Sequence, residues 1–466
     1  MKQTNLLYEK IPYSIDRFFY TYASLTADST HHVLLESGRA GRYSIAGIDP
    51  FAKIQGNENL LEVEQAGNTN ILEGKPLAEL EKWMKSFAFC PEPGLPDFQG
   101  GAIGYISYDY CQYIEELPSL AEDDLQLPIL YFLIFDEWAV YDHEDNCLWL
   151  MVLNQKEAEK KLATLKQSWL TEALEEENSL EHFEIAEHAS FSFTEAEFVE
   201  AVQKIQAYIR EGDVFQVNLA VRQSRQIGIS PIAIYKELRT LNPSPYMGYL
   251  HTPDFQIISG SPELLIQKNG QHVSTRPIAG TRPRGKDDNE DQALVNELIE
   301  NEKERAEHIM LVDLERNDLG RVCEYGSVHV DEFMTVEKYS HVMHIVSHVS
   351  GQLAEEQTVC DLVEAMFPGG TITGAPKIRT LEIIEELEPV KRGIYTGSLG
   401  WIGFNEDLHL NIVIRTMLVR EGMAHVQAGA GIVIDSNPAA EYKESLKKAE
   451  ALWRAMELAE KKESVR

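Results

Sequence analysis

The sequence has few cysteines and few basic residues for its length. Among 466 residues there are five cysteines, and none shows the C-x-x-C spacing of a zinc site, so neither a disulfide framework nor a structural zinc is indicated. Lys and Arg number 42 against 75 Asp and Glu, which gives a formal charge of -33. This charge repels phosphate backbones and anionic membranes, so a general nucleic-acid binder is excluded.

Long hydrophobic runs are also missing. The longest, Leu127 to Phe135, is far shorter than the ~20 residues of a membrane-spanning helix, and Met1 to Lys10 lacks the apolar core of a signal peptide. We therefore expect a cytoplasmic protein with no nucleic-acid partner and no membrane partner. The chain is 44% hydrophobic and 25% charged, which is typical of a globular protein with a sizeable core.

Composition and pattern divide the chain into three regions. Short β-rich runs such as His32–Glu36 and Leu130–Phe135 indicate an α+β domain in the first region. A run with seven Glu and no Lys or Arg, from Glu172 to Glu187, indicates a solvated connection. We predict an N-terminal domain over residues 1–155, an acidic linker over 156–190 and a catalytic domain over 191–466.

The third region mixes strands with helices. A helix is predicted over Thr194–Glu211, with Thr194 as its N-cap and Gly212 at its end. Longer amphipathic helices are predicted at about 290–316 and 438–458, and strands over Val214–Val221, Gln256–Ser259 and Ile412–Val419. Because helices and strands do not alternate strictly, the pattern favours mainly antiparallel sheets.

Two of the predicted helices each carry two carboxylates three residues apart, Glu304 with Glu307 and Glu441 with Glu444. Such pairs share a helix face. If the two faces meet, four carboxylates surround one point, which suits a hard cation such as Mg²⁺. A solvated helix surface is the alternative for either pair taken alone.

A glycine-rich segment, Phe367–Lys377, has the spacing of a phosphate loop, but Ala375-Pro376 stands where such a loop has Lys and then Ser or Thr. The nucleotide-binding interpretation is therefore excluded. A glycine-rich turn before a helix still offers N–H groups to an anion such as a carboxylate, and a plain tight turn is the alternative. Arg415 lies between apolar residues of a predicted strand, where a buried arginine needs an anionic partner.

Together these segments resemble the chorismate-utilising enzymes, a family that includes anthranilate, aminodeoxychorismate, isochorismate and salicylate synthases. The matching segments, in family order, are Gly260–Glu263, Pro277–Thr281, Glu304–His308, Thr371–Lys377, Gly429–Val433 and Glu441–Glu444. Leu34–Ser37 and Gly41–Ser44 resemble the N-terminal domain of anthranilate synthase component I. The resemblance implies an α+β fold of mainly antiparallel β-sheets, packed as a sandwich and surrounded by helices.

The resemblance also implies roles for the matching residues. Glu307 and Glu444 would bind Mg²⁺ directly, with Glu304 and Glu441 acting through water. Glu263 would be the general acid that protonates the departing hydroxyl of chorismate. His344 and Thr371 would lie beside the reacting ring, and the implied substrate-binding residues are Gly280, Thr281, Tyr395, Arg415, Gly429, Gly431 and Lys448. Ser37, Pro243, Tyr246 and Met247 resemble the tryptophan pocket of the family.

The residue at position 216 bears on the nucleophile. Family members that add water resemble one another in having a lysine base there, whereas this chain has Gln216. A neutral amide cannot deprotonate water, but unprotonated ammonia is already nucleophilic, so Gln216 indicates an ammonia-using enzyme. Because the sequence shows no glutaminase domain, the resemblance implies a separate glutamine amidotransferase subunit as partner.

Two ammonia-using branches remain. Gln216–Leu219, Thr275–Thr281 and Tyr395–Trp401 resemble more closely the branch that aminates C4 of chorismate, on the route to para-aminobenzoate and folate. Ala279 is a departure, because some members of that branch have a lysine nucleophile there. Amination at C2, which gives anthranilate, is the alternative. A third hypothesis is a regulatory protein that binds tryptophan and has no catalytic activity. The presence of Glu263 and Arg415 argues against it, because a protein without activity would not need these residues.

Overall fold

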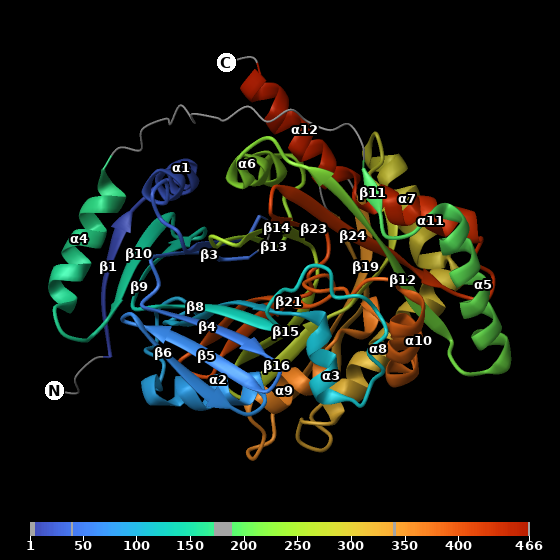
Figure 1. Ribbon diagram of the computed structural model, residues 1–466, viewed down its shortest axis with the longest axis horizontal. Helices are drawn as coiled ribbons and strands as arrows, with labels where there is room; N and C mark the ends of the chain where they lie inside the picture. The colour runs from blue at the N-terminus through green and yellow to red at the C-terminus, as the bar shows by residue number, and fades with distance from the viewer. Residues whose placement is uncertain (1–4, 39–40, 172–188, 339–341, 465–466) are drawn as a thin grey trace.

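The computed structural model describes residues 5–38, 41–171, 189–338 and 342–464. Within these residues the strands form two sheets of twelve strands each, and every pairing between named strands is antiparallel. The sheets lie one above the other in Figure 1, with helices around them. The predicted α+β sandwich is confirmed.

The first sheet contains strands from both ends of the chain. In spatial order it comprises β1 (Leu6–Pro12), β10 (Cys147–Leu153), β9 (Glu137–Asp142), β3 (Tyr43–Ile48), β2 (His32–Glu36), β13 (Tyr246–His251), β14 (Phe255–Ser261), β23 (Thr416–Arg420), β24 (Met423–Ile432), β12 (Gln216–Gln226) and β11 (Ser190–Phe191). The short strand β20 (Gly374–Ala375) pairs with the start of β12.

The second sheet also contains strands from both the N-terminal and the C-terminal parts of the chain. Its order is β17 (Ile278–Pro283), β19 (Val342–Gln352), β16 (His272–Arg276), β15 (Leu264–Asn269), β22 (Leu408–Asn411), β21 (Ser398–Gly403), β7 (Gly101–Ile106), β8 (Leu130–Phe135), β4 (Ala52–Asn57), β5 (Leu60–Gln65) and β6 (Asn68–Glu73), with β18 (His329–Lys338) paired to β19.

This interleaving joins the two predicted domains. β2 pairs with β13 in one sheet and β7 pairs with β21 in the other, so each sheet crosses the predicted boundary. The division at residues 156–190 therefore does not separate the sheets. Helix α4 (Ala158–Leu170) occupies the first part of the predicted linker, and residues 172–188 lie outside the described residues.

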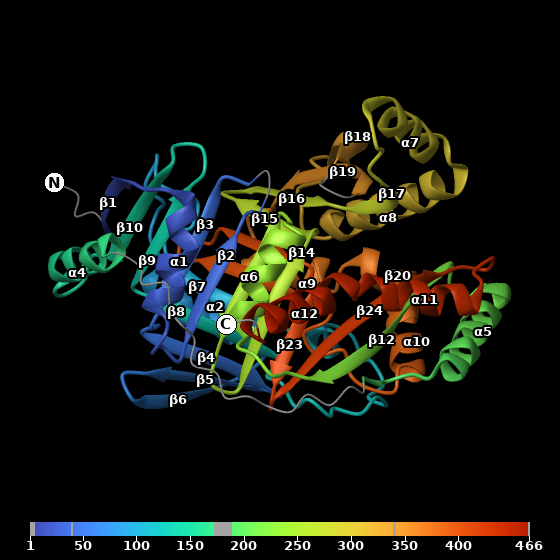
Figure 2. The same ribbon diagram turned by 90° about the horizontal axis from the view of Figure 1, so that it is seen from above.

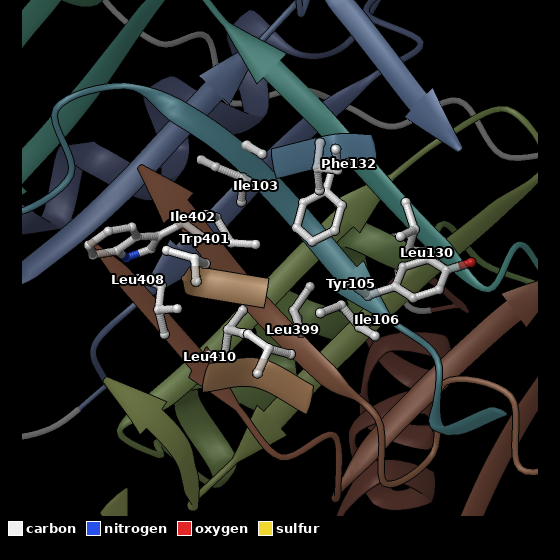
Figure 3. Packing of buried hydrophobic residues seen from close by; sticks show 14 of the residues in the cluster. Ile103, Tyr105, Ile106, Leu130, Phe132, Leu399, Trp401, Ile402, Leu408 and Leu410 are labelled. Carbon is white, nitrogen blue, oxygen red and sulfur yellow. The ribbon is translucent and has the colours of Figure 1, made fainter. Parts of the chain in front are cut away.

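The largest core lies between the sheets. Figure 3 shows side chains of β7, β8, β21 and β22 gathered there, among them Ile103, Phe132, Leu399 and Leu410, all at most 1% exposed. Burying an aliphatic or aromatic side chain of this kind contributes roughly 1.5–3 kcal/mol. The core thus fixes the second sheet against the first, and with it the loops at the strand ends.

Helices cover the outer faces of the sheets (Figures 1 and 2). Over the first sheet lie α1 (Ile15–Leu25), α6 (Pro231–Leu241) and α12 (Glu450–Ser464), and beside the second lie α2 (Pro76–Met84) and α9 (Val359–Met366). At the β12 end are α5 (Glu195–Glu211), α10 (Lys377–Leu387) and α11 (Pro438–Lys448), and near β17–β19 are α7 (Asp288–Glu300) and α8 (Glu302–Gly320). The short α3 (Cys111–Ile114) follows β7. Within the described residues, no helix is long and apolar enough to cross a membrane.

Helix ends follow local sequence signals, with two corrections. α5 begins with a capping box at Thr194 and ends at Gly212 in the left-handed conformation, as predicted. The predicted helix at 290–316 is wrong as a single element, because Asn301 leaves the helical conformation and its side chain accepts a hydrogen bond from the Glu304 N–H. The predicted helix at 438–458 is likewise two helices, α11 and α12, separated at Ala449.

Candidate active site

Glu263 lies between β14 and β15 and is only 5% exposed. Burial raises the pKa of its carboxyl to about 7, although Thr371, the backbone N–H of Ile278 and the charge of Arg415 act in the opposite direction. Its Oε1 atom is buried and makes no hydrogen bond to any described residue. Glu263 can therefore hold a proton near neutral pH and offer it to a bound molecule.

The turn before α10 places Thr371 near Glu263. Thr371 lies in the short 3-10 turn η3 (Gly370–Ile372), and its hydroxyl is buried without a hydrogen-bond partner in the described part of the chain. Gly370 allows this turn to lie against α8, because a Cβ there would be 2.1 Å from Cδ2 of Leu314. Packing thus fixes the turn and holds the hydroxyl of Thr371 beside Glu263, whose pKa it lowers.

Gln216 begins β12 and contacts one of the predicted metal ligands. Its Nε2 donates a hydrogen bond to Oε1 of Glu307 over 3.3 Å. Burial raises the pKa of Glu307, this hydrogen bond lowers it, and the charge of Glu304 raises it further. A Cβ at Gly431 would lie 2.4 Å from Nε2 of Gln216, so the glycine leaves room for this amide. The structure thus brings together four residues that the sequence analysis singled out, namely Gln216, Glu304, Glu307 and Gly431.

His344, on β19, is oriented by its neighbours on β17. Its Nδ1 lies 2.9 Å from the carbonyl oxygen of Gly280 and 3.1 Å from Oγ1 of Thr281. Because a carbonyl only accepts hydrogen bonds, Nδ1 carries the hydrogen in this arrangement. Burial lowers the pKa of His344, which favours the neutral ring. Gly280 has a positive φ of 62°, and a Cβ there would lie 2.9 Å from Oε2 of Glu304.

The second carboxylate pair lies at the start of α11. Asn437 caps this helix, because its side chain accepts a hydrogen bond from the Ala440 N–H over 3.0 Å, with Pro438 at the first helical position as predicted. Glu444 forms an ion pair of 3.0 Å with Lys448. Lys448 also donates to the carbonyl oxygen of Gly429 over 3.0 Å, and its charge lowers the pKa of Glu307.

The four carboxylates do not close on one point. Among the described residues, one group of three ligand atoms lies within 4.8 Å of one another, Asp142, Asp145 and Cys147, and Asp142 is paired with Arg42. Glu304 is likewise held by Arg282 at 3.1 Å. The donor set still fits Mg²⁺, because hard carboxylate oxygens are its usual ligands and a cation would relieve the repulsion between Glu304 and Glu307.

Arg415 and Tyr395 present polar groups without protein partners. In the described residues, neither the guanidinium of Arg415 nor the hydroxyl of Tyr395 makes a hydrogen bond or ion pair. The prediction of Arg415 within a strand is wrong: β22 ends at Asn411, β23 begins at Thr416, and Arg415 has a φ of 50°. This left-handed conformation interrupts the strand pattern beside Glu263.

The arrangement combines a buried carboxyl with a raised pKa, a guanidinium without an ion pair among the described residues, and carboxylates that could hold a cation. The chorismate binding enzyme family matches residues 30–454. The chain belongs to this family. The family resemblance seen in the sequence motifs is thereby confirmed.

Individual relatives of this chorismate-binding enzyme cover almost its whole length. Aminodeoxychorismate synthase component 1 of Bacillus subtilis is 55% identical over 462 residues, 98% of each chain. Anthranilate synthase component 1 of Thermus thermophilus is 44% identical over 453 residues, 94% of this chain and 95% of the relative. The crystal structure of anthranilate synthase component I from Streptococcus pneumoniae superposes with a TM-score of 0.80 at 35% identity, covering 89% of this chain and 92% of the other.

A residue that the sequence did not single out supports the site of this family member. Arg392 is buried, forms a 2.6 Å ion pair with Glu388, and donates to the backbone oxygens of Ile372 at 3.0 Å and Asn218 at 2.8 Å. It thereby ties η3 to β12. In sequence, Glu388 and Arg392 are four residues apart and look like an ordinary exposed helix pair.

The predicted tryptophan pocket borders a cavity of about 750 Å³ between the sheets. Ser37, Tyr246 and Met247 line it, whereas Pro243 is not among its lining residues. Aromatic walls come from Trp401 and the edge-on pair Tyr246–His409, whose ring centroids are 5.4 Å apart.

Proposed function

We propose that the chain is the chorismate-aminating component of aminodeoxychorismate synthase, which converts chorismate and ammonia to 4-amino-4-deoxychorismate. The observation that carries this proposal is the 55% identity to aminodeoxychorismate synthase component 1 of Bacillus subtilis over 98% of both chains, against 44% for the anthranilate synthase component of Thermus thermophilus. Ala279 favours the anthranilate alternative in one respect only, because it removes a covalent route through lysine at this position.

In the proposed mechanism, Glu263 donates its proton to the C4 hydroxyl, which departs as water. Arg415 and Tyr395 bind the carboxylate of the enolpyruvyl arm, a role supported by the lack of protein partners for both groups within the described residues. His344 donates through Nδ1 to the carbonyl oxygen of Gly280, which fixes its ring beside the proposed substrate position, and burial favours the neutral ring by lowering its pKa. Thr371 places its hydroxyl beside Glu263.

The carboxylates are proposed to hold Mg²⁺, with Glu307 and Glu444 as direct ligands and Glu304 and Glu441 acting through water. Bound Mg²⁺ would supply positive charge for the ring carboxylate of chorismate. Gly429 and Gly431 are proposed to present backbone N–H groups to that carboxylate, and Lys448 adds a second positive charge next to Gly429.

Ammonia is proposed to come from a separate glutamine amidotransferase subunit, with both subunits in the cytoplasm on the route to para-aminobenzoate and folate. This rests on Gln216, a neutral side chain where water-adding relatives have a base. The isolated chain should use ammonium salts better at alkaline pH and should not use glutamine. Release of glutamate from glutamine by the purified chain alone would contradict the two-subunit proposal.

The test of the reaction is the product formed from chorismate, Mg²⁺ and ammonium by the isolated chain. Mass spectrometry and NMR should show nitrogen at C4 and an intact enolpyruvyl arm. Anthranilate is strongly fluorescent, and its formation releases pyruvate. Equal amounts of anthranilate and pyruvate, formed without an added lyase, would instead establish amination at C2.

Tryptophan is proposed as a ligand of the cavity lined by Ser37, Tyr246 and Met247. The aromatic walls suit an indole ring, and the cavity of about 750 Å³ has room for one. Calorimetric titration with tryptophan should show binding, and Tyr246→Ala should weaken it while leaving amination without tryptophan within about twofold. If titration of the wild-type chain gives no heat of binding, tryptophan is not a ligand of this cavity.

A further inference from the structure

One buried side chain in the active site has no role so far. Asn218 is two residues after Gln216 on β12, so both side chains lie on the same face of the sheet. Asn218 is 9% exposed, and its Oδ1 atom is buried without a hydrogen bond to any described residue. Leaving a buried amide oxygen unpaired costs about 1–3 kcal/mol, so a ligand is expected to complete it.

The surrounding backbone holds Asn218 in place. Its N–H donates to the carbonyl oxygen of Thr373 over 2.9 Å, and its own carbonyl oxygen accepts from Arg392 over 2.8 Å. A Cβ at Gly429 would lie 2.6 Å from Oδ1 of Asn218, so this amide lies directly over a glycine of β24. The unpaired oxygen therefore has a defined position that does not depend on a flexible loop.

Asn218 lies between the proposed metal ligand Glu307 and the proposed proton donor Glu263. On one side Gln216 contacts Glu307, a proposed metal ligand. On the other, the strand is hydrogen-bonded to the turn that carries Thr371, beside the proton donor Glu263. The side chains of the opposite face, including Val217 and Leu219, pack in a hydrophobic core with α5 and α10. The amide of Asn218 thus faces the reacting groups.

Ammonia needs hydrogen-bond acceptors that leave its lone pair free. An amide oxygen accepts an N–H hydrogen bond and, unlike a carboxylate, carries no charge that would favour ammonium over ammonia. Nε2 of Gln216 is engaged with Glu307, and its Oε1 accepts no hydrogen bond from the described residues. Two neutral acceptors therefore lie on one strand face.

We propose that Asn218, together with Gln216, forms the subsite that binds ammonia before it attacks the ring; this inference rests on the proposed function. The nitrogen lone pair forms the C–N bond at C4 while the C4–O bond breaks, and the leaving oxygen takes the proton of Glu263 and departs as water. The resulting C4 ammonium group returns one proton to the Glu263 carboxylate. Chorismate and ammonia thus give the amine and water, and Glu263 is reset.

The test is steady-state kinetics of Asn218→Leu with ammonium salts at alkaline pH, where ammonia is present. The loss of one hydrogen bond should raise the KM for ammonia about tenfold, while the KM for chorismate stays within twofold. Gln223→Leu is the matched control, since Gln223 is a buried amide on the opposite face of β12 that accepts from Nε1 of Trp453 over 3.1 Å. Its ammonia KM should be unchanged.

A second variant, Asn218→Asp, tests the proposal even if Asn218→Leu does not fold. Asn218→Asp keeps the shape of the side chain and adds a negative charge, so it should bind ammonium in place of ammonia. Its kcat should fall at saturating ammonium without an increase in KM, a pattern that general loosening of the site does not produce. An unchanged ammonia KM in a folded Asn218→Leu, or wild-type kcat in Asn218→Asp, would overturn the subsite. If the wild-type chain forms no C4 amine at all, the proposed function fails first.

Discussion

Several buried polar atoms of the active site have no protein partner among the described residues, whereas two charged residues of the 750 Å³ cavity wall, Glu36 and Arg42, are paired within the protein. In the site, three buried atoms make no hydrogen bond of normal length and angle to any described residue, namely Oε1 of Glu263, Oγ1 of Thr371 and Oδ1 of Asn218. Along the cavity wall, Glu36 binds Arg239 at 2.7 Å and Tyr235 at 2.8 Å, and Arg42 binds Asp142 at 2.9 Å.

The difference separates two uses of a buried polar group. Each unpaired atom in the site lowers the free energy of unfolding by about 1–3 kcal/mol, and a substrate that supplies the missing partner recovers this energy in the complex. The paired groups of the cavity wall already support the fold without a ligand. Variants in the site should therefore reduce catalysis without reducing stability, and variants in the cavity wall should do the reverse.

The largest effect is expected at the proposed metal carboxylates. Glu444→Gln should lower kcat by roughly a thousandfold or more, because a neutral amide is a poor ligand for Mg²⁺ and the lost charge stabilisation amounts to several kcal/mol. Chorismate consumption with and without Mg²⁺ measures this effect. Glu450→Gln, an exposed carboxylate at the start of α12, is the control and should retain activity. Full turnover in EDTA by either the wild type or Glu444→Gln would refute the metal assignment.

Glu263→Gln should lower kcat by about 10²–10⁴-fold, because glutamine cannot donate a proton. At saturating ammonia the wild-type kcat should fall as pH rises above about 7, the pKa at which Glu263 loses its proton, even though ammonium salts supply more ammonia at alkaline pH. The folded pKa lies above the ordinary value of 4.5, so wild-type stability falls as pH rises between the two values. Glu263→Gln lacks this ionisation and should gain more thermal stability relative to wild type at pH 8 than at pH 5.

The pH dependence of the stability gain of Glu263→Gln is measured by the calorimetric melting temperatures of the variant and the wild type at pH 5 and pH 8. A gain that is the same at both pH values would show that Glu263 does not ionise with a raised pKa in the folded state. A variant less stable than wild type at pH 8 would show that the Glu263 carboxylate is stabilised within the fold, contrary to the comparison drawn here.

Much of the site was predictable because its residue types are local signals. Thr194, Asn437 and Pro438 mark helix starts in sequence, and all three do so in the structure. Glu304 and Glu307 share a helix face by spacing alone. The sequence motifs also singled out Glu263 and Gln216, and the structure shows Gln216 in contact with Glu307.

Other features depend on contacts between distant segments and could not be predicted. The left-handed conformation of Arg415 has no local sequence signal, whereas the helix break at Asn301 follows a local N-cap signal, the hydrogen bond of its side chain with the Glu304 N–H. The interleaving of strands in both sheets joins residues more than 200 positions apart, as in the pairing of Leu34 with Tyr249. Arg392 was missed for the same reason: its contacts on η3 and β12 are distant in sequence.

A smaller change of chemistry is expected from Gln216→Lys. A lysine amine that is partly removed from water can act as a base near neutral pH, so this variant should add some water to chorismate and yield isochorismate. Chromatography of the products formed without ammonia is the measurement, with wild-type enzyme as the control. If the variant is folded and forms no isochorismate, Gln216 does not by itself decide the nucleophile.

The smallest effect on catalysis is expected at the cavity wall. Glu36→Gln weakens the buried pair with Arg239, whose guanidinium also stacks over the Phe19 ring at 4.4 Å, and should lower the free energy of unfolding by about 1–3 kcal/mol. Because Glu36 contacts none of the proposed catalytic groups, kcat per folded molecule should stay within twofold. Urea denaturation and active-site titration measure the two quantities separately.

Glu64→Gln is the matched control for this change, since Glu64 forms an exposed pair with Lys53 at 2.8 Å and such surface pairs contribute only about 0–1 kcal/mol. Its stability should be nearly that of wild type. If Glu36→Gln instead reduced kcat tenfold without affecting stability, the cavity wall would belong to the catalytic apparatus. The pairing of its charges would then serve to transmit a ligand's effect to Glu263, whose neighbours Pro262 and Leu264 line the same cavity.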